Sequence, residues 1–186
     1  FQMVTEHHGQ MDLYVFIERR HSHCDPNLGY REPLESYIFG QIVSAVEYLH
    51  NVMHIIHRDI KDENVIIDER FHVKLIDFGS STYYIPLSAM STDNVQTKLF
   101  STFYGTVEYC APEVLAGEKY HGPELEMWSL GVLLYILLFG EQPFYDIEET
   151  LRCDLVGLKP PYSISATCFQ DVSGLLDKAP CQSMTM

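Results

Sequence analysis

The stretch His57-Arg58-Asp59-Ile60-Lys61-Asp62-Glu63-Asn64 decides the fold of this chain. Thirteen residues after it comes Asp77-Phe78-Gly79, and further on comes Gly105–Glu113, with the sequence GTVEYCAPE. The HRD triplet alone has little specificity. The ordered combination of HRDxxxxN, a short hairpin, DFG and GTxEYxAPE is highly specific, and it indicates where the chemistry lies.

The residue types in this stretch suit phosphoryl transfer. That reaction needs a carboxylate that orients an attacking hydroxyl and accepts its proton, and it needs oxygen ligands for Mg²⁺. Asp59 and Asn64 lie five residues apart on one loop, so one can face the hydroxyl and the other the metal. Asp77 supplies a second carboxylate, and Lys61 can neutralise charge that develops on the transferred group. The alternative is that these residues only satisfy turns and caps, which leaves three motifs in order unexplained.

The sequence on either side of these motifs predicts mostly helices. Apolar residues recur at helical spacing from Pro33 to about Val52, and Glu124–Phe139 is apolar on nearly every face, which indicates a central helix. Met11–Arg20 predicts a short amphipathic helix. Two β-branched runs, Val65–Ile67 and Val73–Ile76, flank a polar segment and predict a hairpin. We therefore expect a mainly helical α+β fold with a small hairpin beside the motifs.

The composition excludes several classes of protein. The 186 residues carry 12 Lys+Arg against 26 Asp+Glu, a formal net charge of −14, so we expect no nucleic-acid binding and favour a basic protein partner. The five cysteines are odd in number and widely spaced, which favours a reducing, intracellular compartment. The first ten residues lack the features of a signal peptide. Leu130–Phe139 has about half of the roughly 20 residues that a membrane span needs, so we expect no membrane span.

On these motifs the chain resembles the C-terminal lobe of the eukaryotic protein kinases, and Lys61 with the GTxEYxAPE segment resembles the serine/threonine kinases. HRDIKDEN, KLIDFGS, GTVEYCAPEVL and GPELEMWSLGVLLY together resemble the subfamily of PAS-domain-containing kinases, which is linked to nutrient and energy signalling. The resemblance implies that residues 1–176 are a partial kinase domain of the α+β class. This domain would hold the mainly helical C-terminal lobe and almost nothing of the N-terminal lobe, and residues 177–186 would be a divergent tail.

The resemblance also implies roles for the residues that match the kinase pattern. ATP and Mg²⁺ would be the cofactors. The catalytic residues would be Asp59, Lys61, Asn64 and Thr106, with Thr106 hydrogen-bonded to Asp59 and Lys61. The residues that bind the nucleotide would be Glu6, His8, Asp12, Ile66 and Asp77. The metal ligands would be Asn64 and Asp77.

Further positions concern regulation and substrates. Arg58 would reach a phosphate carried by Thr102 on the activation segment, and the rings of His57 and Phe78 would stack. The substrates would be proteins phosphorylated on Ser or Thr, and the carboxylates of Asp12 and Glu63 would meet a basic residue upstream of the acceptor. The implied location is cytoplasmic, with the nucleus as an alternative, and the oligomeric state stays open.

Several positions depart from the kinase pattern. The sequence holds no Gly-rich loop, no strand lysine and no partner glutamate, so we expect the 186 residues alone to bind ATP poorly and to transfer phosphate negligibly. Glu126 stands where the family has Asp, and Glu113 would lack the late arginine that usually pairs with it. The competing hypothesis is a non-catalytic, pseudokinase-like scaffold, although such a chain has no chemical need for Asp59, Lys61, Asn64 and Asp77.

Overall fold

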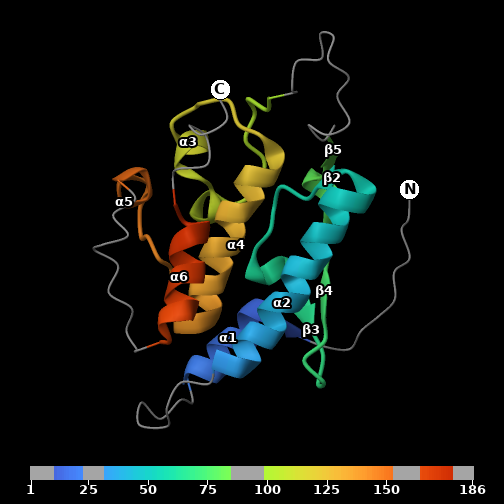
Figure 1. Cartoon of the computed structure of the whole chain (residues 1–186), viewed down its shortest axis with the longest axis vertical. Coiled ribbons are helices and arrows are strands. Elements are labelled where there is room, and N and C mark those ends of the chain that lie inside the picture. The colour runs from blue at the N-terminus through green and yellow to red at the C-terminus, as the bar shows by residue number, and fades with distance from the viewer. Residues whose placement is uncertain (1–10, 23–31, 85–98, 153–163, 178–186) are drawn as a thin grey trace.

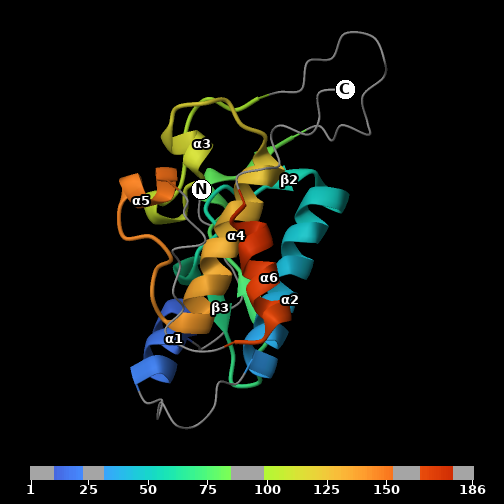
Figure 2. The same ribbon diagram turned by 60° about the vertical axis from the view of Figure 1, so that its left-hand side comes forward.

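The computed structural model describes residues 11–22, 32–84, 99–152 and 164–177. Helix α4 (Gly122–Phe139) runs through the middle of the molecule with nearly all of its side chains buried. It packs against α6 (Ala166–Leu175), α2 (Glu32–Tyr48) and α1 (Leu13–Ser22), as Figures 1 and 2 show. The predicted mainly helical lobe is therefore confirmed.

Helix α4 owes its position to its sequence. It begins at Gly122 with a proline in its first turn, where the missing amide hydrogen costs nothing, and it is capped after Phe139 by Gly140, whose φ of +72° is left-handed. Gly131 interrupts the apolar run because a Cβ there would lie 2.9 Å from the Cβ of Leu175. Each fully buried leucine of this helix, such as Leu133, contributes about 1.5–3 kcal/mol.

Among the described residues, α4 is the helix that is long and apolar enough to cross a membrane. It has 18 residues rather than the ten of the run seen in the sequence, and 83% of it is buried inside the molecule. Such burial is typical of a core helix.

Helix α2 begins at Glu32 with Pro33 in its first turn, as predicted. It continues into a π-helical turn, Leu49–Met53, which ends at His54 in a left-handed conformation with φ +52°. The chain then forms β2 (Ile55–Ile56), which pairs antiparallel with β5 (Thr82–Tyr83). This pairing joins the residues just before the HRD motif to those just after DFG.

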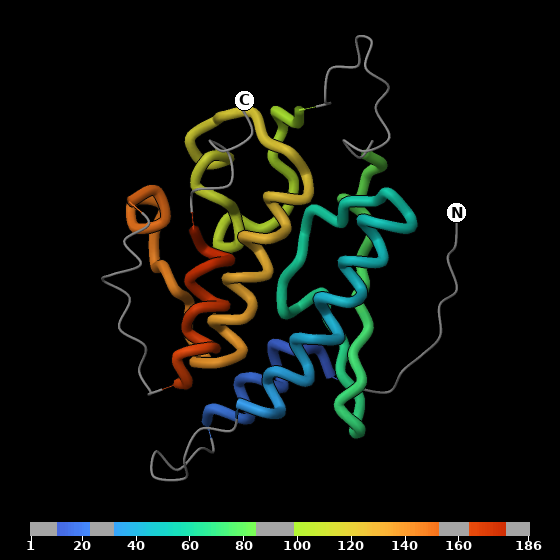
Figure 3. The backbone as a smooth tube through the Cα atoms, viewed as in Figure 1, coloured from blue at the N-terminus to red at the C-terminus, as the bar shows by residue number. Residues whose placement is uncertain are grey.

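The predicted hairpin is confirmed as β3 (Val65–Ile67) and β4 (Val73–Leu75), which pair antiparallel. A two-residue strand, β1 (Met11–Asp12), pairs with the other edge of β3 and gives the sheet order β1-β3-β4. Figure 3 shows the hairpin on the opposite side of the molecule from α6. The short helices α3 (Pro112–Leu115) and α5 (Ile147–Arg152) complete the described elements.

Glu113 is half-buried and is not without a partner, and the expectation that it lacks the late arginine of the kinase pattern stays a prediction. The tail beyond Asp177 lies outside the described residues, so its divergence from residue 177 onward stays a prediction.

Candidate active site

The Asp59 carboxylate is held on both of its oxygens. The Thr106 hydroxyl donates to Oδ1 at 3.0 Å, and the Asn64 amide donates to Oδ2 at 3.0 Å and to the Asp59 carbonyl at 2.8 Å. The predicted hydrogen bond between Thr106 and Asp59 is therefore confirmed. A carboxylate has about four lone-pair sites, so two are left to receive a proton.

Two hydrogen bonds fix the catalytic loop against the DFG strand. His57 is fully buried, and its Nε2 lies 2.9 Å from the carbonyl of Ile76. The Ile76 amide donates to the carbonyl of Asn64 at 2.9 Å. The Phe78 ring packs against the His57 ring with centroids 4.8 Å apart, so the predicted contact is confirmed, but the rings meet edge-on and do not stack as expected. Asp77, the next residue after Ile76, is in this way brought to the Asn64 end of the loop.

The donor set at Asn64 and Asp77 fits a Mg²⁺ ion. The Asn64 amide nitrogen is occupied by Asp59, which leaves its side-chain oxygen as the ligand atom. Asp77 has φ +60°, and its Oδ1 accepts from the Gly79 amide at 3.1 Å, which leaves Oδ2. No group of three His, Cys, Asp or Glu side chains suited to a metal occurs among the described residues. Mg²⁺ commonly takes one or two protein oxygens plus phosphate oxygens, which is what this pair could supply.

Lys61 differs from its expected arrangement. Its Nζ lies 2.7 Å from Oε2 of Glu63, so the predicted hydrogen bond to Thr106 is wrong. The tight turn at Asp62–Asn64 brings the Glu63 carboxylate within reach, and opposite charges at this distance attract more strongly than a hydroxyl does. The hydrogen bond to Glu63 raises the pKa of Lys61, which therefore stays charged at neutral pH.

Gly105 allows the activation segment to approach the catalytic loop. Its φ is +116°, and a Cβ there would lie 2.5 Å from the Arg58 carbonyl oxygen and 3.2 Å from Asp59 Oδ1. Only glycine adopts this conformation without strain. The close approach places Thr106, the next residue, against Asp59.

Arg58 is already engaged by the activation segment. Its guanidinium lies 4.3 Å from the centroid of the Tyr104 ring and 5.8 Å from that of Phe100, and its Nε donates to the Ser80 carbonyl at 2.5 Å. Thr102 has an exposed side chain, and its carbonyl accepts from the Tyr120 hydroxyl at 2.8 Å. The segment is therefore held by aromatic contacts to Arg58 and by Tyr120.

The expected nucleotide-binding residues lie on two parts of the chain. Ile66 is half-buried on β3, between the cross-strand partners Asp12 and Lys74, and its side chain points away from the face that buries its neighbours. Asp12 caps α1, because its Oδ1 accepts from the Val15 amide at 2.8 Å. Glu6 and His8 lie outside the described residues, so their roles stay predictions.

A cleft of about 410 Å³ opens beside Thr106 and Glu63. Its lining carries a cluster of carboxylates: Glu18, Asp62, Glu63, Glu108 and Glu141. Glu63 was predicted to face a basic substrate group, whereas Asp12 is not among the residues that line the cleft. The sequence did not indicate Glu18, Glu108 or Glu141, because they come from three distant segments.

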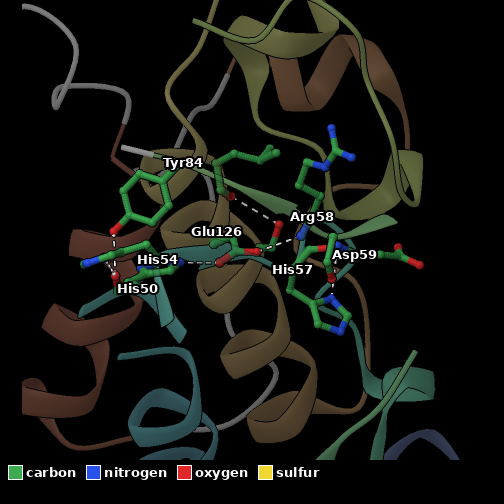
Figure 4. Close-up of polar contacts among 10 residues, drawn as sticks. His50, His54, His57, Arg58, Asp59, Tyr84 and Glu126 are labelled. Carbon is green, nitrogen blue, oxygen red and sulfur yellow. Dashed lines mark hydrogen bonds and ion pairs between the residues drawn. The ribbon is translucent and has the colours of Figure 1, made fainter. Parts of the chain in front are cut away.

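Behind the catalytic loop, Glu126 occupies the position of the usual Asp. Its Oε1 accepts from the backbone amide of Arg58 at 2.7 Å, and its Oε2 pairs with Nε2 of His50 (Figure 4). The substitution at Glu126 was visible in the sequence, but its partner His50, on another helix, was not.

Comparison with known proteins agrees with this geometry. The family described as "Protein kinase domain" matches residues 1–186, and the chain belongs to the protein kinase family. It is 51% identical over its whole length to the "PAS domain-containing serine/threonine-protein kinase" of Mus musculus, of which it spans 12%. It is 41% identical over 92% of its length to "Serine/threonine-protein kinase PSK2" of Saccharomyces cerevisiae, and 47% identical over 80% to "Serine/threonine-protein kinase SIK1" of Mus musculus. It spans 14% and 18% of those two proteins, respectively.

Proposed function

We propose that the chain is the catalytic lobe of a serine/threonine kinase that transfers the γ-phosphate of ATP, with Mg²⁺, to Ser or Thr hydroxyls of proteins. The observation that carries the proposal is the Asp59 carboxylate, held by Thr106 from the activation segment and by Asn64 from its own loop. A carboxylate fixed on both oxygens is preorganised to orient a hydroxyl and to accept its proton. Mg²⁺-ATP, when bound, supplies the transferable phosphoryl group and the cation that offsets its charge.

Each side chain of the site has its own proposed role in phosphoryl transfer. Asp59 orients the acceptor hydroxyl and takes its proton, while Asn64 and Asp77 offer the oxygens for the metal. Lys61, kept charged by Glu63, lies on the same loop, where it can offset negative charge on the transferred group. We propose that Ile66 and Asp12 contribute to the nucleotide site from the sheet, together with Glu6 and His8.

The reaction also requires parts that the 186 residues do not carry. A Gly-rich loop, a strand lysine and its partner glutamate are absent from the sequence. We therefore propose that the kinase acts when this lobe is joined to an N-terminal lobe, and that the 186 residues alone are inactive. The second candidate is a non-catalytic, pseudokinase-like scaffold. The complete set of Asp59, Lys61, Asn64 and Asp77 favours the kinase.

The particular subfamily is a further proposal. The likeness to the PAS-domain-containing kinase of Mus musculus over the whole chain supports a kinase of that type, acting in nutrient and energy signalling. The odd, widely spaced cysteines support a cytoplasmic location, with the nucleus as an alternative.

The acidic cleft supports a substrate with a basic residue upstream of the acceptor. Glu63 lines the cleft next to Thr106, and Glu18 and Glu141 extend the negative charge away from Asp59. An arginine side chain pairs with carboxylates through directional, charge-assisted hydrogen bonds.

In the full-length protein, a Ser peptide with Arg about three residues upstream should exceed its Ala counterpart in kcat/KM by about 1–3 kcal/mol, or roughly 5- to 150-fold. Glu63→Ala and Glu141→Ala should each shrink that ratio. Glu47→Ala, which removes an exposed charge from α2, should leave it unchanged. Equal kcat/KM for the Arg and Ala peptides would reject the basic substrate. Absence of phosphate transfer to any Ser or Thr peptide would reject the kinase itself.

A further inference from the structure

Tyr84 makes an unusual set of contacts behind the catalytic loop. Its hydroxyl donates to the carbonyl of His50 at 2.9 Å, and its backbone amide donates to the carbonyl of His54 at 3.0 Å. Its ring stands edge-on to the rings of His50 and His54, with centroids 6.0 Å and 6.3 Å away. Figure 4 shows Tyr84 above His50 and His54, with Glu126 between these histidines and Arg58.

The acceptor of the Tyr84 hydroxyl lies in the π-helical turn Leu49–Met53. π-helical turns are rare, depart from the regular hydrogen-bond pattern of an α-helix and occur frequently at functional sites. The His50 carbonyl also lies 3.1 Å from Nδ1 of His54, so two side chains converge on one carbonyl oxygen. Burial, together with the carboxylates of Glu126 and Glu124, raises the pKa of the Tyr84 phenol, which therefore keeps its proton at neutral pH.

The His50 ring links the Tyr84 contact to the residues of the active site. His50 and Glu126 are buried, with 7% and 1% of their surfaces exposed, and they pair through Nε2 and Oε2. The other oxygen of Glu126 accepts from the Arg58 amide at 2.7 Å. Arg58 has φ +67°, a left-handed conformation that costs free energy for any residue with a Cβ. The Glu126 carboxylate thus holds the strained residue that immediately precedes Asp59.

We propose that Tyr84 is a positioning residue for the phosphoryl transfer: through the carbonyl of His50 it fixes the imidazole that orients Glu126, and Glu126 in turn fixes the backbone at Arg58 and the direction of Asp59. The inference rests on the proposed kinase function. Tyr84 directly follows β5, which begins two residues after the turn that holds Phe78. It therefore couples the segment after DFG to the catalytic loop from behind, without contact with substrate or nucleotide.

The test is Tyr84→Phe in the full-length protein, since this change removes one hydroxyl and keeps the ring. The matched control is Tyr83→Phe, which removes a hydroxyl from the adjacent residue, whose side chain is 72% exposed. We expect Tyr84→Phe to lower kcat about three- to tenfold while KM for ATP and for the peptide each change less than twofold. Tyr83→Phe should match the wild type. An unchanged kcat in Tyr84→Phe, or equal losses in both variants, would overturn the proposal.

A double-mutant cycle separates positioning from a general loss of packing. If Tyr84 acts through Glu126, then Tyr84→Phe should cause no further loss of kcat in a Glu126→Gln background. Multiplication of the two separate losses in the double variant would contradict the proposal.

A readout independent of turnover keeps this inference distinct from the kinase function. The ring ¹⁵N resonances of His50 should shift in Tyr84→Phe and stay in place in Tyr83→Phe. Unshifted resonances in Tyr84→Phe would overturn the coupling even if the protein is an active kinase. Shifted resonances in a protein that transfers no phosphate would support the coupling and reject the kinase.

Discussion

Asp62 shows how the fold changes the properties of a single carboxyl group. It lies between Lys61 and Glu63 in the catalytic loop and is 6% exposed. Its Oδ1 accepts from the Glu63 amide at 2.9 Å. Burial raises the pKa of Asp62 above its usual value, an effect that the hydrogen bonds around it only partly offset. Ionised Asp62 therefore reduces the stability of the folded protein at neutral pH.

The direction in which stability changes with pH follows from proton linkage. Between the unfolded pKa, about 3.9, and the raised folded pKa, the folded state binds more protons, so its stability falls as the pH rises through this window. Asp62→Asn keeps an acceptor oxygen without the charge, so it should raise the thermal unfolding midpoint at pH 7. The gain should shrink toward zero as the pH falls to about 4.

Asp68→Asn is the matched control, because backbone hydrogen bonds, led by that from His72, lower the pKa of half-buried Asp68. It should lower the midpoint at pH 7, and this loss should also vanish on acidification. Calorimetric scans of both variants across this pH range check the prediction. A midpoint at pH 7 that is lower in Asp62→Asn than in the wild type would contradict it.

Sequence reasoning found single residues where the chemistry requires one residue type at a fixed spacing, as for Asp59, Asn64 and Asp77. It found Thr106 through a motif, and the structure bears out its bond to Asp59. It missed His50, whose importance depends on a ring that meets Glu126 from 76 residues away. It also misplaced Lys61, because a choice between two nearby partners depends on local turn geometry.

In the activation segment, aromatic rings contact Arg58 where a phosphate was expected to contact it. The phosphate was predicted on Thr102, facing Arg58, but the Arg58 guanidinium lies over the Tyr104 ring at 4.3 Å. A cation–π contact of this kind is worth about 0.5–2 kcal/mol. Phe100 and Tyr120 stack with centroids 5.8 Å apart and exchange two backbone hydrogen bonds of 2.9 and 3.0 Å. The described part of the segment is thus ordered without a modified residue.

We therefore expect activity to be largely independent of phosphorylation at Thr102. In the full-length protein, Thr102→Ala should lower kcat/KM by less than about tenfold, equivalent to roughly 1.4 kcal/mol. Tyr104→Leu should cost more than Thr102→Ala, because it removes the ring that holds Arg58. Ser101→Ala, a change at an exposed neighbour, is the control. Mass spectrometry must show that the wild type carries no phosphate here, and a drop beyond tenfold in Thr102→Ala would contradict the expectation.

At the scale of the whole molecule, the sequence predicted the long helices best. Helical periodicity placed α2 and α4 within a few residues of their observed bounds, and alternation placed the β3–β4 hairpin. The strands β1, β2 and β5 have two residues each and so carry no periodic signal. The acidic cleft also exists only in the folded chain, since its carboxylates come from α1, the catalytic loop, the activation segment and the turn that follows α4.

The whole arrangement positions two carboxylates for different tasks. Asp59 is bound on both oxygens by protein donors, whereas Asp77 accepts from the Gly79 amide on Oδ1, and we propose that its Oδ2 binds a metal. Conversion of each to Asn should therefore impair the kinase in different ways.

The most direct measurement compares Asp59→Asn with Asp77→Asn in the full-length protein, with turnover measured on a Ser peptide and Mg²⁺-nucleotide affinity measured by calorimetry. Asp59→Asn should lower kcat by about 10²–10⁴-fold and leave the Kd for Mg²⁺-ATP within about threefold, because a proton acceptor is lost rather than a metal ligand. Asp77→Asn should weaken Mg²⁺-ATP binding. Wild-type turnover in Asp59→Asn would contradict the assignment of Asp59 as the residue that receives the proton, and with it the account of this site.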